Sequence, residues 1–144
     1  MKKMLTACLF AVSLYMQAQT TESKPIVPQP NWIKTETQMG MGYIDTNGNV
    51  VLNPEYEELR PFGELSPGLA IIVQDGQMGL IDFEGTIIVA PQYDSITTGS
   101  DYNPNWLMVE QYEEYGFIDF HGNEVVPIAY DKFATPNNPA NTQN

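Results

Sequence analysis

Residues 42–56 read Gly-Tyr-Ile-Asp-Thr-Asn-Gly-Asn-Val-Val-Leu-Asn-Pro-Glu-Tyr, and the same frame returns at 79–93 and at 116–130. The copies lie 37 residues apart, and the alignment extends without gaps over units 30–66, 67–103 and 104–140. Six columns are identical in all three units: Pro30, Pro67 and Pro104; Gly42, Gly79 and Gly116; Ile44, Ile81 and Ile118; Asp45, Asp82 and Asp119; Gly48, Gly85 and Gly122; Tyr56, Tyr93 and Tyr130. Because unrelated columns rarely match three times, the chain contains a tandem repeat.

Each unit has the pattern of short antiparallel strands. In the middle unit, an apolar run at 68–74 precedes Asp75-Gly76, a pair typical of a two-residue hairpin turn. We predict a return strand at 77–82, a turn at 83–85, a third strand at 86–90 and a brief fourth strand at 92–96. Pro91 should end the third strand, because proline has no N–H for the ladder. Gln38-Met39 and Tyr112-Glu113 are weaker turn signals, which predicts looser hairpins in the outer units.

A unit of this size is too small to bury a core alone, so neighbouring units must pack on one another. Three units are also too few for an ordinary closed propeller, which has about 4–8 blades. No stretch has the apolar period of a helix. The sequence therefore predicts an all-β fold in which three tandem antiparallel β-hairpin units of 37 residues form a compact array, either open or barrel-like.

The first residues are typical of an export signal. Lys2 and Lys3 precede a largely apolar run at 4–16, and Gln17-Ala18-Gln19 follows it. We predict a signal peptide at 1–18 and a protein that is periplasmic, on the cell surface or secreted. A competing interpretation is a lipobox at 5–8, with Cys8 lipidated. No apolar run is long enough to span a bilayer well, so no transmembrane segment is expected.

The segments that flank the repeats differ from them in composition. Residues 19–29 are polar and rich in proline, which indicates an extended linker. Residues 134–144 lack large apolar side chains beyond the repeats, which predicts a disordered tail.

The charge and the rarity of Cys and His narrow the classes of function. The chain has 18 Asp and Glu against 6 Lys and Arg, a net charge of −12, and loss of Lys2 and Lys3 with the signal would make it −14. Such a charge argues against nucleic-acid binding and against docking on an anionic membrane. The single Cys excludes an intramolecular disulfide framework and a Cys-rich zinc site, and the single His leaves few options for His-based catalysis.

In the three frames at 42–56, 79–93 and 116–130, the chain resembles the WG-repeat (KWG-repeat) family. Phe62, Gly68-Leu69-Ala70 and Val73 are similar to the family's Phe-x-x-Gly-Leu-Ala-x-Val segment. The Trp of the family's Trp-Gly pair is replaced by Met41, Met78 and Tyr115, and Pro127 lies one position early in the third unit. The resemblance implies a small all-β unit found in tandem in bacterial proteins that are often exported, and it implies no activity.

Asp45, Asp82 and Asp119 are the most prominent candidates for chemistry. Each lies three residues before a glycine, which favours an Asx turn. The alternative is calcium, since residues 45–49 begin like an EF-hand loop. Val50 then replaces the required Gly and Tyr56 the bidentate Glu, so the motif fails. We expect no metal and no cofactor.

The remaining repeat columns are assigned structural roles. Gly42, Gly79 and Gly116 should let a ring or another strand approach closely. Gly48, Gly85 and Gly122 should supply the positive φ of a turn. Tyr56, Tyr93 and Tyr130 should form a core ladder between repeats.

Trp32 and Trp106 are the candidate ligand-binding residues, because an indole ring next to Asn31 or Asn105 suits stacking on a sugar. Leu69 in the equivalent place favours packing instead. A glycosidase needs two carboxylates at a fixed spacing, and nothing selects a pair among Glu55, Glu57, Glu58, Glu110, Glu113 and Glu114. A Ser-His-Asp triad would have to use His121, which is expected to be an exposed turn residue.

The leading hypothesis is a non-enzymatic, exported binding or scaffold module that presents an acidic β surface to an unknown protein partner. The alternative is a carbohydrate-binding or carbohydrate-active protein that uses Trp32, Trp106 and the clustered acids, with a glycan as its ligand.

Overall fold

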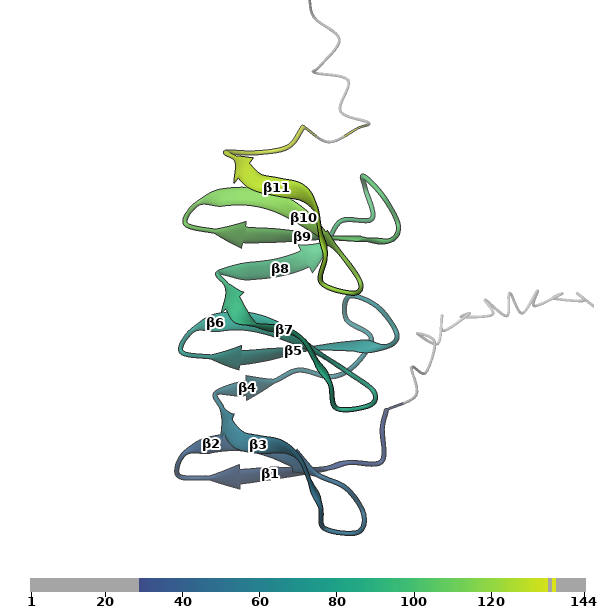
Figure 1. Ribbon diagram of the computed structural model, residues 1–144, viewed down its shortest axis with the longest axis vertical. Coiled ribbons are helices and arrows are strands. Elements are labelled where there is room, and N and C mark those ends of the chain that lie inside the picture. Colours follow the sequence, from purple (N-terminus) through teal and green to yellow (C-terminus); the bar gives the residue numbers. More distant parts are fainter. Residues whose placement is uncertain (1–28, 135, 137–144) are drawn as a thin grey trace, which may run out of the picture.

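The computed structural model describes residues 29–134 and 136, and the regular elements within them are β-strands in three stacked sheets (Figure 1). The first sheet contains β1 (Ile33–Thr37), β2 (Gly40–Ile44) and β3 (Val50–Tyr56). The second contains β4 (Glu58–Leu59), β5 (Leu69–Gln74), β6 (Gln77–Asp82) and β7 (Ile87–Tyr93). The third contains β8 (Ser95–Thr98), β9 (Trp106–Gln111), β10 (Glu114–Asp119) and β11 (Glu124–Tyr130).

All strand pairs are antiparallel, and the predicted all-β fold of three repeat units is confirmed. The predicted signal peptide and most of the predicted linker and tail lie outside the described residues, in 1–28, 135 and 137–144.

The second and third sheets each take their first strand from the preceding repeat unit. β4 lies in unit 30–66 but pairs with β5, with Leu59 opposite Ile72. β8 lies in unit 67–103 but pairs with β9, from Ser95 opposite Glu110 to Thr98 opposite Leu107. The prediction of a fourth strand at 92–96 therefore needs correction: the strand is at 95–98, and it extends the next sheet rather than its own.

The prediction that Pro91 ends the third strand is wrong, because β7 continues through this residue. The β6–β7 ladder is irregular between Met78 and Leu80, where β7 bulges. Gly79 makes the bulge possible: a Cβ there would meet the Val89 carbonyl oxygen and would lie 2.7 Å from the Pro91 nitrogen. A bulge can hold a proline because its residues need not all donate to the ladder.

The first hairpins of the outer units are as tight as the middle one, which corrects the expectation of looser turns. Thr37 is opposite Gly40, and Gln111 is opposite Glu114, so each turn has two residues. Tyr112 and Glu113 have φ of 54° and 65°, close to the 51° and 73° of Asp75-Gly76. The β9–β10 hairpin thus adopts a turn with two positive φ values without any glycine.

The apolar core lies between neighbouring sheets, and side chains along β5 alternate between the two interfaces. Leu69, Ile71 and Val73 pack with residues of the third sheet. Ala70 and Ile72 pack with residues of the first sheet. Because β5 is covered on both faces, its sequence is a nearly continuous apolar run.

Candidate functional site

The three repeat aspartates accept hydrogen bonds within their own turns. Asp45 Oδ1 accepts from the backbone N–H groups of Asn47 and Asn49, both at 2.8 Å, and Oδ2 accepts from Asn49 Nδ2 at 2.9 Å. Asp119 makes the same three bonds to residues 121 and 123, and Asp82 Oδ1 accepts from the N–H groups of residues 84 and 86. These contacts are those of an Asx turn.

The same turn contacts lower the pKa values of the Asp45 and Asp119 carboxyl groups. The side-chain hydrogen bond from Asn49 is the largest cause that lowers the pKa of Asp45, and backbone N–H groups add to it. Asn123 lowers the pKa of Asp119 in the same way. Within residues 29–134 and 136, no group of three or more His, Cys, Asp or Glu side chains is gathered as a metal site would need.

The glycine turns between the second and third strands of each unit have φ of 86°, 85° and 83° at Gly48, Gly85 and Gly122. Their surroundings differ. A Cβ on Gly85 would lie 2.6 Å from Val51 Cγ1 of the first sheet, and one on Gly122 would lie 2.9 Å from the Ile88 carbonyl oxygen of the second. A Cβ on Gly48 would meet nothing within 4 Å. Each turn after the first therefore rests on the preceding sheet.

The structure does not bring Trp32 and Trp106 together. Trp32 precedes β1 in the first sheet, with its ring centroid 5.5 Å from that of Tyr43 and 5.8 Å from that of Phe62. Trp106 begins β9 in the third sheet and packs 5.4 Å from Phe117. Both indoles are half-buried. Trp32 also lines a pocket of about 120 Å³ with Gln29, Pro30, Tyr43 and Phe62.

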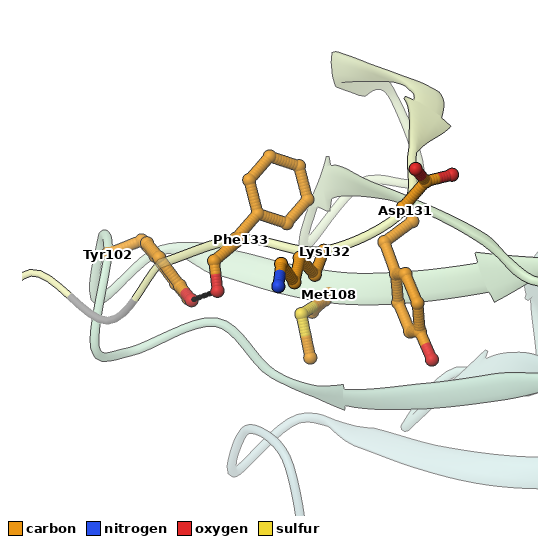
Figure 2. Close-up of a pocket in the computed structure, with 6 residues that line it drawn as sticks. Tyr102, Met108, Asp131, Lys132 and Phe133 are labelled. Carbon is orange, nitrogen blue, oxygen red and sulfur yellow. Dashed lines mark hydrogen bonds between the residues drawn. The ribbon is translucent and has the colours of Figure 1, made fainter.

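A larger hollow of about 280 Å³ lies at the C-terminal end of the stack (Figure 2), lined by Tyr102, Met108, Tyr115, Asp131, Lys132 and Phe133. The Tyr102 hydroxyl donates to the Phe133 carbonyl oxygen at 3.4 Å. The Glu110 carboxylate raises the pKa of Tyr115. Sequence reasoning missed this hollow, because Tyr102 lies in the β8–β9 loop and its equivalents in the other units are Leu65 and Pro139.

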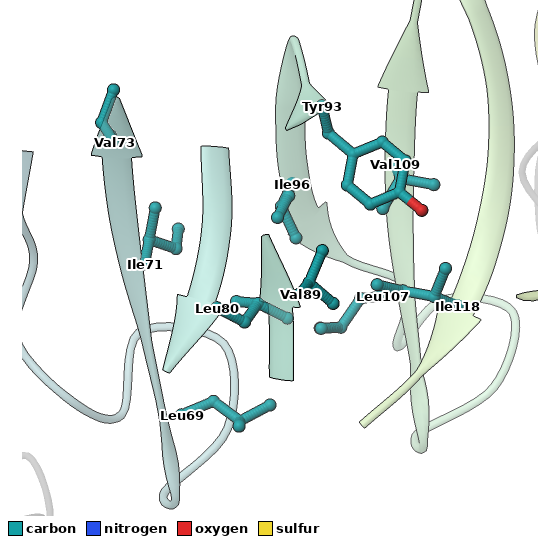
Figure 3. Packing of buried hydrophobic residues seen from close by; sticks show 10 residues of the cluster. All are labelled: Leu69, Ile71, Val73, Leu80, Val89, Tyr93, Ile96, Leu107, Val109 and Ile118. Carbon is teal, nitrogen blue, oxygen red and sulfur yellow. The ribbon is translucent and has the colours of Figure 1, made fainter. Parts of the chain in front are cut away.

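The tyrosine column forms a core ladder at two positions only. Tyr56 and Tyr93 are 3% and 8% exposed, and Figure 3 shows Tyr93 among Val89, Ile96 and Val109. Burial raises the pKa of both hydroxyls. Tyr130 is 47% exposed, which corrects the expectation of a core role. No described sheet follows the third one, and the ring packs on that of Phe133 with centroids 5.2 Å apart.

The candidates for acid–base and nucleophilic chemistry lie on the surface. His121 is exposed in its turn, and the hydrogen bond that it gives to Asp119 comes from its backbone N–H. Two of the clustered acids join different strands: Glu57 accepts from the Gly76 N–H, and Glu110 accepts from the Ser95 hydroxyl. Glu58 pairs locally with Arg60 at 3.0 Å. Over the residues that the structure describes, there is no helix with the length and apolar character to cross a membrane.

Comparison with models of protein families identifies the repeat. A family model described as WG containing repeat matches residues 41–77, 78–110 and 115–138. The chain therefore belongs to this repeat family, and the matches begin 37 residues apart, at Met41, Met78 and Tyr115. No curated protein and no solved structure matches the chain.

Proposed function

We propose that the chain is a non-enzymatic repeat module that binds a protein partner through its surface. The observation that carries this proposal is the character of the interior. The buried core of the described residues is aliphatic and aromatic, with the Tyr56 and Tyr93 rings as its members that carry a hydroxyl, and none of its side chains is charged. Polar chemistry is confined to the surface, and the three repeat aspartates are engaged in turns.

One side of the stack offers an acidic surface to such a partner. The β5–β6 and β9–β10 turns lie on the same side as the connections that lead into β4 and β8 (Figure 1). Their acids, which we call the acidic edge, are Glu57, Asp75, Asp94, Glu113 and Glu114. The described Lys and Arg residues are Lys34, Arg60 and Lys132, and Arg60 pairs with Glu58. Charge complementarity therefore favours a partner with a basic segment.

Titration with a peptide of ten lysines tests the acidic edge. We expect saturable binding that weakens as salt rises, and no binding of a peptide of ten glutamates. The double variant Asp75→Asn/Glu114→Gln should bind about two- to tenfold more weakly, because each exposed charge pair contributes little. The charge-matched control is Glu64→Gln/Glu124→Gln. Equal weakening by both pairs, or no saturable binding, would contradict the proposal.

The alternative, carbohydrate binding, is favoured by the pocket that Trp32 lines together with Gln29 and Tyr43. A glycan panel separates the two proposals. Binding that is lost in Trp32→Ala/Trp106→Ala would favour this alternative, and release of shorter sugars would show an enzyme. No binding, or binding unchanged by the double variant, would exclude it.

We also propose that the protein is exported, on the grounds of Lys2, Lys3 and the apolar run at 4–16. Intact-mass analysis of protein from its native cells should find a chain that begins at Gln19. Recovery of the protein from the cytoplasm with residues 1–18 still attached would contradict export. A lipid on Cys8 would support the competing lipobox.

A further inference from the structure

The contact that joins neighbouring sheets occurs twice within the chain and has the same chemistry each time. The backbone N–H of Glu57 donates to the Val73 carbonyl oxygen, and that of Asp94 donates to the Glu110 carbonyl oxygen, both at 2.8 Å. The carboxylates of these two acids accept from the next hairpin turn, from the Gly76 N–H at 3.1 Å and from the Tyr112 N–H at 2.8 Å. A short strand from one unit is thus fixed to the first strand of the next.

A third copy of this joining segment lies at the C-terminal end of the stack. Residues 130–133, Tyr-Asp-Lys-Phe, stand 37 residues after Tyr-Asp-Ser-Ile at 93–96. The chain leaves β11 in the same direction as it leaves β7 toward β8 (Figure 1). Phe133 packs 4.7 Å from the ring of Phe117. Yet the segment joins no described sheet, and Val125 and Tyr130 are 40% and 47% exposed.

The matching acceptor lies at the N-terminal end. Among the described strands, β1 pairs with β2 only, whereas β5 and β9 are each paired on both sides. Ile33 is 52% exposed, although its equivalents Ala70 and Leu107 are 3% and 0% exposed. The Gly48 turn likewise has open space where the Gly85 turn rests on Val51.

The charged residues of β1 do not protect this end. Edge strands are often blunted by charges that face the would-be partner. Lys34 and Glu36 occupy the columns of Ile71 and Val73, which face the following sheet. Ile33 and Thr35 occupy the columns of Ala70 and Ile72, which face the preceding sheet. The face of β1 that would meet a preceding sheet is therefore free of charge.

We propose that the C-terminal end of one copy docks on the N-terminal end of a second copy, so that residues 131–134 add to β1 as a fourth strand. The internal contacts give the register: the Asp131 N–H donates to the Glu36 carbonyl oxygen, and its carboxylate accepts from the Gln38–Met39 turn. Val125 packs under the Gly48 turn, as Val51 packs under that of Gly85. Such strand addition is heterologous, and its repetition builds head-to-tail chains.

A second copy is the occupant that fits, because donor and acceptor come from the repeat columns that already join the sheets within one chain. The inference goes beyond the proposed function. It uses the two ends of the stack and holds whether or not a basic partner binds the acidic edge.

Sedimentation velocity on the full chain, and on a chain beginning at Gln19, tests the proposal between about 1 µM and 1 mM, the range of weak interfaces. The mean sedimentation coefficient should rise with concentration without stopping at a dimer. Because each copy carries a net charge of −12, or −14 when it begins at Gln19, association should strengthen as salt screens the repulsion. Ile33→Glu and Val125→Glu should each weaken association about tenfold or more, because a carboxylate would be buried unpaired. Ile87→Glu, at an exposed position of the middle sheet, is the matched control and should have no effect.

Mixing the two end variants gives the sharpest readout. Each retains one intact end, so an equimolar mixture of Ile33→Glu and Val125→Glu should form one-to-one dimers that grow no further. A chain that stays monomeric over the whole range overturns the proposal, including the case in which residues before Gln29 cover β1. A dimer that neither variant weakens overturns it as well.

Discussion

The carboxylate of Asp94 accepts a hydrogen bond from the backbone N–H of Tyr112 at 2.8 Å, across the boundary between two repeat units. Tyr112 has φ of 54° and an 81% exposed side chain, so neither residue type nor burial holds it in the left-handed region. The acid of one unit therefore supports the hairpin turn of the next.

Asp94→Ala should lower the free energy of unfolding by about 1 kcal/mol, because the Tyr112 N–H loses its partner. Urea denaturation measures the change. Asp101→Ala, an exposed aspartate in the β8–β9 loop, is the control and should stay within about 0.5 kcal/mol of the parent. Equal losses in the two variants would show that the bond does not support the turn.

Gly79→Ala should destabilise the protein by roughly 3 kcal/mol, because the new Cβ would meet backbone atoms of β7 that cannot easily move. Gly68→Ala is a matched control. A Cβ there meets nothing within 4 Å, and the backbone is outside the left-handed region. It should change stability by no more than about 0.5 kcal/mol. If both variants unfold at the same urea concentration, the close approach of the β7 backbone to Gly79 does not require a glycine.

The Asx turns should make stability depend on pH in the acid range. The pKa values of Asp45 and Asp119 are lowered in the folded chain, whereas an unfolded aspartate titrates near about 3.9. Their contribution is therefore complete above about pH 4 and is lost as the pH falls through the lower folded values. Asn49→Ala removes the largest cause at Asp45, so NMR titration should find the pKa of that carboxyl raised toward its ordinary value. An unchanged pKa in this variant would argue against the role of the Asn49 amide.

A chain that ends at Asn103 should melt at least about 10 °C lower than the full chain. It loses the third sheet, so β8 has no partner strand, and Val89, Tyr93 and Ile96 lose the side chains that cover them. A chain that ends at Ala134 removes only the predicted tail and should melt like the parent. Equal melting of the shorter chain would mean that the units do not stabilise one another.

Local sequence signals predict where the strands lie better than they predict which strands pair. The β5–β6 hairpin was predicted at its observed turn, because Asp75-Gly76 is a strong signal and both strands are apolar. The β9–β10 turn was underestimated, because part of its support comes from Asp94, 18 residues earlier. The exchange of β4 and β8 between sheets was not predicted, because a strand of two to four residues carries no local mark of its partner.

In the candidate site, too, local contacts are predictable from the sequence and contacts between distant segments are not. The turn contacts of Asp45, Asp82 and Asp119 are local, within four residues, and the sequence was sufficient to predict them. The exposure of Tyr130 depends on whether a further sheet packs on the third one, and the repeat column alone does not carry that information. The hollow beside Tyr102 depends on how the β8–β9 loop folds back on the third sheet.

The exchange of strands between sheets means that a sequence unit and a sheet are out of phase by one strand. Because the array repeats every 37 residues, removing or adding 37 residues inside it removes or adds one strand of each kind and one joining contact. Such a change in the middle would lengthen or shorten the stack by one sheet and leave both end faces as they are. Arrays of this kind can change their reach by recombination between copies without evolving a new interface.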